Sequence, residues 1–452
     1  MKRAQLGLIF GLVAGALWPA RAAWATQPLD AFLERAKTQS FDAREAKATE
    51  RQRSYEADAA LGRLTPAFSA RGVYTRNQYE AAAQLPVSAA IPAMPAMGGM
   101  PATDAVPAKT VKLVITPLNQ LDAFLQLDVP LIDLASYHRY RAASALAQSA
   151  REQQGATTID VSRSVARAYY QFLGADSLVQ SARESIKAAE ANLKNVDDRR
   201  SAGAATDLDH ERAFAAVARS QQDLADAELG SALAGRALET LSGLSPEPAQ
   251  GFPEDDLRSE GALGSWLGLA VATPGERAAQ RLGEAAEQNR KAASSALLPT
   301  LAGSAQERFT NATGFGGRNS FYTLQLVLSW RLDYATLATN DAQNAALDVQ
   351  RVRVERSRRA LEDSAFEAFR RVEAGVVKSR AARAQESAAA RAASLSADRY
   401  SAGVATQLDV TQAQRDAFLA SAARIQADTD LAFARASLRL AAGVAVSDKR
   451  PR

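Results

Sequence analysis

The sequence predicts a mainly α-helical protein made of two similar halves, each with a pair of β-strands and a long helical hairpin. The first observation is an internal repeat: residues 199–209 (RRSAGAATDLD) return 200 positions later as residues 399–409 (RYSAGVATQLD), with eight of eleven positions identical. The second is a heptad pattern in long proline-free stretches, and the third is a period-2 alternation that occurs in both halves. A repeat of this size indicates two structurally equivalent halves.

Residues 1–25 are predicted to be a secretory signal peptide. Lys2 and Arg3 form a basic start, and the apolar run over 6–18 is too short to span a membrane. Cleavage is expected after Ala25, with a second possible site after Ala22. No other stretch reaches the roughly 18 consecutive apolar residues of a membrane helix. We therefore expect an exported protein without a helical membrane anchor.

Composition excludes several classes of partner and linkage. Removal of the signal peptide takes away Lys2, Arg3 and Arg21, so the formal charge falls from +4 to about +1. Nucleic acid is therefore not expected as a partner. The chain has no cysteine, which excludes disulfides, thiolate metal sites and a cysteine-linked lipid anchor. We expect packing and assembly to hold the fold together.

The first half begins with a helix and continues with strands. Residues 26–63 are polar and alanine-rich and are predicted to form an N-terminal helix. Residues 64–130 change to a period of two and are predicted to form the first strand pair. A stretch rich in Ala, Pro, Met and Gly, residues 79–110, is predicted to be a long loop within that pair. Pro130 ends the second strand because proline cannot donate to a ladder.

Residues 131–244 are predicted to form the first helical hairpin, with its tip near 201–207. Residues 133–200 contain no proline, and about 65 helical residues would make an arm of roughly 100 Å. Apolar residues recur every seven positions, and small or apolar residues follow each of them by three, as in coiled coils. These residues are Val165, Phe172, Val179, Ile186 and Leu193, followed by Ala168, Ala175, Ala182, Ala189 and Val196.

The second half repeats this order after a proline-containing linker. Its clearest signal is the alternation of Tyr322, Leu324, Leu326 and Leu328 with polar neighbours. The predicted segments are the linker over 245–257, a helical segment over 258–297, the second strand pair over 298–333, the second helical hairpin over 334–444 with its tip near 401–407, and a tail over 445–452.

Four strands in one chain leave two open sheet edges. A barrel that spans a bilayer must be closed and needs at least about eight strands, so several chains would have to contribute. An ordinary sheet in a soluble protein is the alternative reading of the alternation. The export signal and the long helices attached to both strand pairs make that alternative less favoured.

The order of elements resembles the TolC family of outer-membrane efflux proteins. The resemblance covers nearly all of the mature chain, and its most specific parts are residues 399–403 (RYSAG), 408–410 (LDV) and 129–131 (VPL). It implies a homotrimer with a shared twelve-stranded β-barrel in the outer membrane of a Gram-negative bacterium and a long periplasmic α-barrel. The loop over 79–110 would then be extracellular. The implied function is a passive exit duct of a tripartite efflux or type I secretion system, energised by an inner-membrane pump through a periplasmic adaptor.

The repeated tip sequences predict a local structure and, through the resemblance, a role. Gly203 and Gly403 permit the positive φ that ends a helix, and Thr206 and Thr406 are plausible N-caps of the returning helices. A turn with no further role would explain these residues equally well. The resemblance implies that the tips are the docking surface of the adaptor, through Arg199, Ser201, Gly203, Arg399, Ser401 and Gly403.

The resemblance also implies an entrance gate near the tips. Asp209 and Asp409 lie in the first turns of the returning helices, where favourable interaction with the helix dipole would already account for them. In the family, acids at these positions face the entrance, and Tyr400 helps to close it with Asp209 as partner. A further family acid is replaced here by Gln412, and a family arginine by Ala405. The implied gate residues are Asp209, Tyr400, Asp409 and Gln412.

No metal site, cofactor or catalytic group is expected. Met94, Met97 and Met100 have the thioether chemistry that suits Cu(I) or Ag(I), but a flexible apolar loop is the favoured interpretation. His138 and His210 are isolated in the sequence, and no grouping of serine, histidine and acid suggests an enzyme. A soluble periplasmic coiled-coil adaptor is the alternative function. It would have one helical hairpin inside a small β domain, whereas this sequence has two hairpins and two strand pairs.

Overall fold

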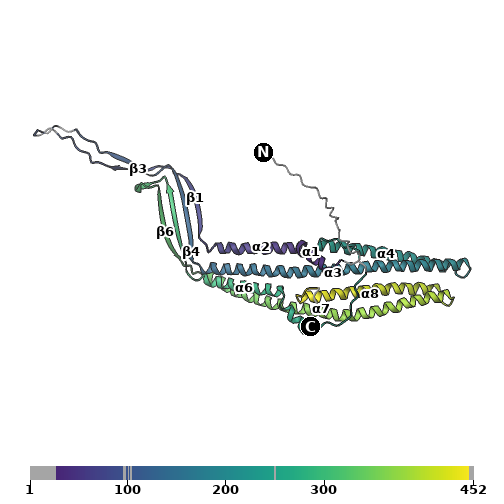
Figure 1. Ribbon diagram of the computed structural model, residues 1–452. Coiled ribbons are helices and arrows are strands. Elements are labelled where there is room, and N and C mark those ends of the chain that lie inside the picture. Colours follow the sequence, from purple (N-terminus) through teal and green to yellow (C-terminus); the bar gives the residue numbers. More distant parts are fainter. Residues whose placement is uncertain (1–26, 95–97, 100, 102–103, 249–250, 447–452) are drawn as a thin grey trace, which may run out of the picture. The chain divides into compact units, whose positions relative to one another are not determined.

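The computed structural model describes residues 27–94, 98–99, 101, 104–248 and 251–446 (Figure 1). The chain divides into two compact units. Unit 1 comprises Met1–Ala46, Gln154–Pro274 and Arg359–Arg452, and unit 2 comprises Lys47–Gln153 and Gly275–Arg358. The predicted signal peptide over 1–25 lies outside the described residues. Within the described part, no helix combines the length and the apolar character needed to cross a membrane.

Unit 2 contains one four-stranded antiparallel sheet in the order β1-β4-β5-β6. The central pairing joins the two halves of the chain: Leu125 of the first strand pair lies opposite Glu307 of the second. β1 and β6 are the two edges of the sheet. The strands are β1 (Ala67–Arg76), β4 (Asn119–Ile132), β5 (Thr300–Thr310) and β6 (Ser320–Ser329).

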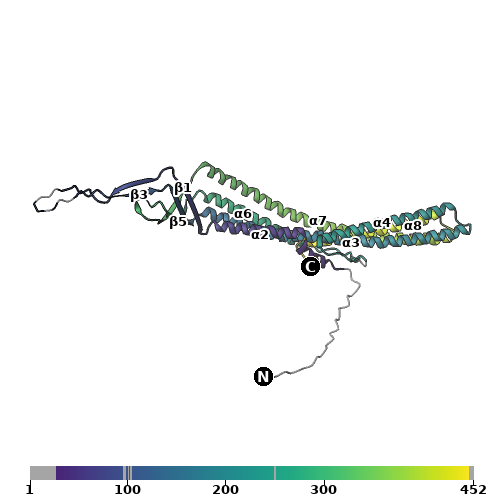
Figure 2. The same cartoon turned by 90° about the horizontal axis from the view of Figure 1, so that it is seen from above.

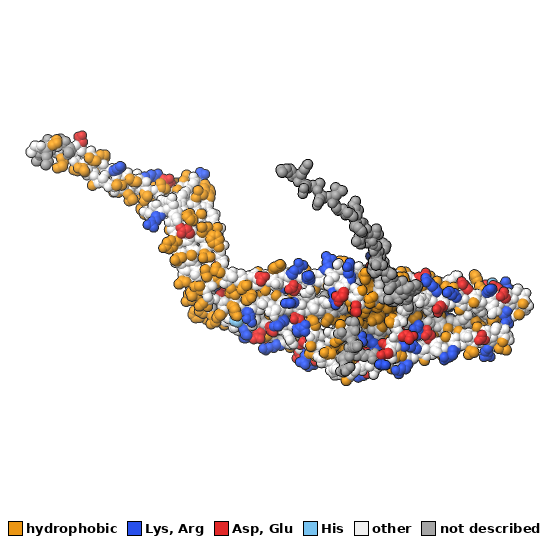
Figure 3. Space-filling model, viewed as in Figure 1, with side chains coloured by type: hydrophobic (Ala, Val, Ile, Leu, Met, Phe, Trp, Pro, Cys, Tyr) orange, Lys and Arg blue, Asp and Glu red, His pale blue; other side chains and the backbone are white. Residues whose placement is uncertain are grey.

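The two faces of this sheet have opposite chemistry. One face is mostly apolar and solvent-exposed, with Glu307 as a charged member, and hydrophobic side chains dominate the surface of the strands in Figure 3. The other face is polar: Arg308 forms an ion pair with Asp122 (Nη2 to Oδ1, 2.8 Å), and Gln306 donates to Gln126 (3.4 Å). The apolar face comprises Phe68, Tyr74, Leu121, Leu125, Leu127, Phe309, Tyr322, Leu324, Leu326 and Leu328.

The prediction that residues 79–110 form only a loop is wrong at both ends of the segment. β2 (Ala81–Pro86) and β3 (Thr110–Thr116) pair as a separate two-stranded sheet. The sequence pattern also predicts one continuous strand after this loop, as far as residue 130, where the structure has the two strands β3 and β4. Pro117 separates them because it cannot donate to a ladder, and its carbonyl accepts a hydrogen bond from the Asn77 side chain (2.9 Å).

Two predicted helical segments are each divided in the structure. Residues 26–63 contain α1 (Leu29–Gln39) and α2 (Phe41–Gly62), because Ser40 adopts an extended backbone (φ −61°, ψ 147°). The hydroxyl of Ser40 then accepts from the Ala43 N–H (3.3 Å) and caps α2. Residues 258–297 contain α5 (Leu263–Ala270) and α6 (Pro274–Ser295). Pro274 opens α6, a position where its missing N–H costs nothing.

The two helical hairpins are formed by α3 (Leu134–Ser201) with α4 (Asp207–Ser242) and by α7 (Tyr334–Ser401) with α8 (Gln407–Ala441). In unit 1 the two turns lie at the same end (Figures 1 and 2). Most of the predicted heptad positions of α3 are buried. The exceptions, which are half-buried, are Ala175, Ile186 and Leu193. The fully buried ones are Val165, Ala168, Phe172, Val179, Ala182, Ala189 and Val196.

Two apolar clusters hold unit 1 around the middle of these helices. Phe32 of α1 packs on α3, with its ring 5.7 Å from that of Tyr169. Trp266 of α5, fully buried, packs against Val372 of α7 and Leu431 of α8. Burying a large apolar side chain stabilises a fold by about 1.5–3 kcal/mol. These clusters therefore fasten short peripheral helices to the long ones.

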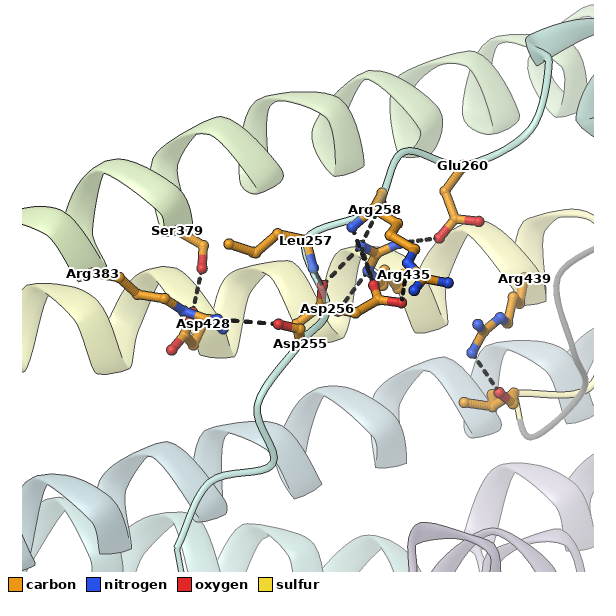
Figure 4. A network of polar contacts seen from close by, with 11 residues as sticks. Asp255, Asp256, Leu257, Arg258, Glu260, Ser379, Arg383, Asp428, Arg435 and Arg439 are labelled. Atoms are coloured by element: carbon orange, nitrogen blue, oxygen red, sulfur yellow. Dashed lines mark hydrogen bonds and ion pairs between the residues drawn. The ribbon is translucent and has the colours of Figure 1, made fainter.

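The segment 255–260, which we call the strap, is bound to α8 by ion pairs and to α7 by a hydrogen bond in unit 1 (Figure 4). Arg435 of α8 is at its centre. Its Nε lies 2.7 Å from Asp255 Oδ2, and it also pairs with Glu260. Burial alone would lower the pKa of Arg435, but hydrogen bonds and charge from Asp255 and Glu260 raise it above its ordinary value.

A second buried carboxylate continues this network along the helices. Asp428 is 2% exposed and accepts hydrogen bonds from Ser379 and Arg383, the latter at 3.1 Å. Arg383 also donates to the carbonyl oxygen of Asp255 (3.1 Å). The strap and the α7–α8 pair thus share one set of charges. Removal of one member leaves the others buried without their counter-charge, which is costly.

We predict that Arg435→Ala releases the strap. Loss of one partner of a buried ion pair costs about 3–5 kcal/mol, so the strap should open before the rest of the unit unfolds. Limited proteolysis should then cut between Gly251 and Ala262, and the thermal midpoint should fall. Arg236→Ala is the control, since its pair with Glu239 is largely exposed and contributes about 0–1 kcal/mol. Equal cleavage of both variants would contradict the prediction.

Candidate functional site

Both hairpin turns are built in the same way, and both predicted glycines have a left-handed backbone. Gly203 has φ 73° and Gly403 has φ 79°. Gly203 N–H donates to the Arg200 carbonyl (2.9 Å), and the next N–H, that of Ala204, donates to the Arg199 carbonyl (2.7 Å). The second turn repeats both bonds. This is the Schellman arrangement that ends a helix, and it confirms the prediction made for the two glycines.

The returning helices begin with a capping box at each tip, which confirms the predicted N-caps. Thr206 Oγ1 accepts from the Asp209 N–H (3.2 Å), and the Asp209 carboxylate accepts from the Thr206 N–H (3.1 Å). Thr406 and Asp409 repeat this exchange at 3.3 and 2.8 Å. Each tip carboxylate therefore has a structural task at the start of its helix.

The two tips are joined to each other through Arg199. Its guanidinium lies over the ring of Tyr400, 4.7 Å from the centroid. Its Nη1 donates to the carbonyl oxygens of Tyr400 (2.8 Å) and Ser401 (3.1 Å). A cation placed on the last carbonyls of α7 satisfies acceptors that the helix leaves open. Ser201 and Ser401 instead donate to carbonyls of their own helices, those of Asp198 and Asp398.

Tyr400 is buried between the helices of both hairpins. It forms a small cluster with Val196, Ala213 and Val410. Burial raises its pKa, Arg199 opposes this shift, and Asp209 adds to it. Asp209 is therefore near Tyr400, as the resemblance implies, but no hydrogen bond joins them within the described chain, and the ring is stacked on Arg199. The carboxylate of Asp209 is already used by its capping box.

The remaining predicted gate residue, Gln412, is exposed on α8. It lines a small groove of about 290 Å³ together with three arginines, Arg212, Arg219 and Arg415, and one acid, Asp223. Gln412 thus lies apart from the Arg199–Tyr400 contact. Gln412 is uncharged, so the lining carries more positive than negative charge.

Sequence reasoning missed one buried polar group at the second tip. Gln407, 1% exposed, has no partner for either amide atom in the part of the chain that is described. Its counterpart in the first repeat, Asp207, is exposed and lies 3.6 Å from Arg200. The difference between the two copies at this position was the signal that could have found it.

The structure describes only one of the three methionines. Met94 is exposed, and Met97 and Met100 lie outside the described residues. Across the described ranges, no group of three or more His, Cys, Asp or Glu residues has the arrangement of a metal site.

A family model described as outer membrane efflux protein matches residues 32–244 and 276–444. This chain belongs to that family. The match covers both strand pairs and both helical hairpins, so it includes the β sheet of unit 2 and the joined tips of unit 1. No curated protein matches this efflux protein in sequence.

Solved structures show the same fold at low sequence identity. A membrane protein from Pseudomonas aeruginosa is similar with a TM-score of 0.76 and 20% identity, over 92% of this chain and 90% of that one. The Campylobacter jejuni CmeC outer membrane channel has a TM-score of 0.73 and 14% identity, over 99% and 96%. The open state of the Neisseria gonorrhoeae MtrE outer membrane channel has 0.73 and 18%, over 94% and 91%.

The resemblance to the TolC family is therefore confirmed. The protein is an outer-membrane efflux channel with a helical periplasmic extension. A soluble adaptor is not supported, because the matched family and the similar structures are channels of this kind. The family supplies the class of function. The residues at the tips must be assigned from their own contacts.

The capping box at Asp409 gives a pH prediction. The Thr406 N–H and then its hydroxyl lower the pKa of Asp409 below its ordinary value. A lowered folded pKa means that the stabilisation is complete above the unfolded pKa of about 3.9 and is lost as the pH falls through the folded value. The start of α8 should therefore keep its hydrogen-exchange protection from pH 7 to about 5 and lose it below about 4.

The measurement is hydrogen exchange of peptides covering residues 404–412, corrected for the intrinsic rate at each pH. Asp409→Asn should show the same weak protection from pH 3 to pH 7, because the amide carries no charge at any pH, and it should match the unchanged protein only at the acid end. A peptide from the middle of α8 serves as the internal control. Equal protection at pH 3 and pH 7 in the unchanged protein would contradict the prediction.

Proposed function

We propose that this efflux protein assembles as a trimer whose three sheets close into one twelve-stranded barrel. It would act as the passive exit duct of a tripartite efflux or type I secretion system. An inner-membrane pump would supply the energy, and a periplasmic adaptor would dock on the helical tips. The duct would carry out no catalysis of its own, since its task is to replace a lipid barrier by a wet passage.

The single observation that carries this proposal is the open sheet of unit 2. Its edges, β1 and β6, have no strand beside them in the described chain. In lipid, each unsatisfied backbone group costs several kcal/mol, so a sheet can span a membrane only as a closed barrel. Strands β1, β5 and β6 have 10, 11 and 10 residues, which matches the 9–11 or so needed to cross a bilayer at a tilt.

The side chains of the sheet fit a barrel with lipid outside and water inside. The exposed apolar face suits lipid, and Arg308, Asp122 and Gln126 lie on the face that would line the lumen. Aromatic residues lie toward both ends of the apolar face. Trp330 follows β6 at one end, and Tyr74 lies on β1 toward the other. Such girdles are typical of outer-membrane barrels.

We predict that the two faces of β6 tolerate charge differently. Leu326 lies near the middle of the strand on the apolar face, and Leu326→Arg should destabilise the inserted barrel by about 2–4 kcal/mol. Gln325→Arg is the matched control, because it introduces the same charge one residue away on the opposite face. The amount of heat-stable trimer recovered from outer membranes in detergent measures the effect.

Two results would contradict the assignment of the apolar face to lipid and of the sheet to a barrel. If Gln325→Arg abolishes the trimer while Leu326→Arg is tolerated, the apolar face does not meet lipid. If the unchanged protein is a stable monomer in buffer without detergent, the barrel itself is wrong. Either result would leave the family membership intact and remove this account of how the chain spans the membrane.

We further propose roles for the tips. Exposed space around both glycines supports a docking surface: a Cβ added to Gly203 or Gly403 would meet nothing within 4 Å. The proposed docking residues are Arg199, Ser201, Gly203, Arg399, Ser401 and Gly403. The proposed entrance gate comprises Asp209, Tyr400, Asp409 and Gln412. Arg199 links the two sets, since it holds Tyr400 by stacking and the α7 carbonyls by hydrogen bonds.

We predict that Gly403→Val prevents docking without preventing assembly. A β-branched residue in a left-handed backbone costs about 1–2 kcal/mol, which is small against the packing of the long helices. The trimer should form and insert, while cross-linking to the adaptor and export should fail. Ala402→Val is the control, because it also places a valine at the turn, at a position without a positive φ. Normal export by Gly403→Val would remove the docking role of this tip.

A further inference from the structure

A groove of about 570 Å³ lies between α3, α7 and α8 in unit 1, away from the tips. Its lining is rich in cations. Arg163 and Arg167 come from α3, and Arg371 and Lys378 come from α7. The acids in the lining are Glu367 and Asp430.

Two of the four cations have no carboxylate partner in the described structure. Arg163 pairs with Asp160 (2.8 Å), and Arg371 donates twice to Glu367 (2.6 and 3.1 Å). Asp430 accepts from Gln426 (2.9 Å). Gln426 is neutral, so Asp430 keeps its negative charge. Arg167 and Lys378 have no carboxylate at ion-pair distance among the described residues, and the four cations of the lining outnumber its two acids.

The same groove offers an aromatic ring. The guanidinium of Arg167 lies over the ring of Phe433, 4.9 Å from its centroid. Thr429 also lines the groove but is 6% exposed, and its hydroxyl oxygen faces Gly174 of α3, so that hydroxyl belongs to the helix packing and not to the groove surface.

The groove and the strap lie on opposite sides of α8. Arg435 holds the strap, while Phe433 and Ser437, two positions on either side of it, line the groove. Two helical residues correspond to a rotation of about 200°. If the helices wall a duct, as the proposed function has it, the strap must lie outside, because inside it would obstruct the passage. The groove then faces the lumen, and the inference that follows rests on the proposed function.

We propose that this groove is a binding subsite for organic anions that carry an aromatic ring. Arg167 and Lys378 would bind the anionic group with charge-assisted hydrogen bonds. Phe433 would contact the ring. Unpaired cations in a partly enclosed groove raise the local concentration of anions. A site on a conduction path must also release its ligand, so weak binding is expected.

The first test is equilibrium binding of a fluorescent aromatic anion, 1,3,6,8-pyrenetetrasulfonate, to the detergent-solubilised full chain. Arg167→Gln combined with Lys378→Gln should weaken binding about tenfold or more, because each lost group removes a charge-assisted contact. Lys187→Gln combined with Lys194→Gln is the matched control. These lysines are exposed on α3 outside the groove, and replacing both removes the same amount of positive charge. Equal weakening by both pairs would overturn the subsite in favour of non-specific attraction.

The second test is block of single-channel current by the same probe in a planar bilayer. The unchanged protein should be blocked, and the groove variant should conduct normally with the block lost. If the unchanged protein conducts and both proteins are blocked equally, the subsite is wrong and the duct stands. If the unchanged protein forms no conducting trimer, the proposed duct is wrong. In that case the equilibrium binding measurement alone decides whether the groove binds the anion.

Discussion

The open edges of the β1-β4-β5-β6 sheet are the constraint on which the rest of this protein depends. Hydrogen-bonding groups along β1 and β6 need partners, and lipid can offer none. In the proposed trimer, the strands of further copies would satisfy them by closing the barrel. Within one chain, β4 of the first half pairs with β5 of the second half. The two strand pairs therefore form one continuous sheet rather than two separate ones.

Features whose cause is local were predictable from the sequence. The left-handed glycines, Gly203 and Gly403, and the threonine caps follow from chemistry within about six residues. The alternation of β5 and β6 shows on its own which face is apolar. β2 gave no such signal, because its Ala-rich sequence becomes a strand only through pairing with β3. The break at Ser40 gives no such signal, because the composition stays helical across it. The break before Pro274 does give one, since proline disrupts a helix interior and is tolerated in its first turn.

Contacts between distant residues were not predictable from one sequence. Arg199 and Tyr400 are 201 positions apart, and Arg435 lies 180 positions from Asp255. Nothing in the local pattern of either partner indicates the other. The family resemblance did point to Tyr400, yet it named Asp209 as its partner and did not foresee the stacking of Arg199. Two repeats with nearly the same sequence have thus come to differ at their tips through single substitutions.

The segment that leads from the linker into the second half is fastened to the second hairpin twice, by forces of different origin. The strap is held by ion pairs to Arg435, and Trp266, a few residues further along, is held by apolar packing. Apolar packing weakens on cooling, whereas ion pairs fail when acid neutralises their carboxylates. Neither a cold shock nor an acid shock alone removes both fastenings. In an outer-membrane protein, this segment therefore stays attached to the second hairpin when conditions weaken only one of the two forces.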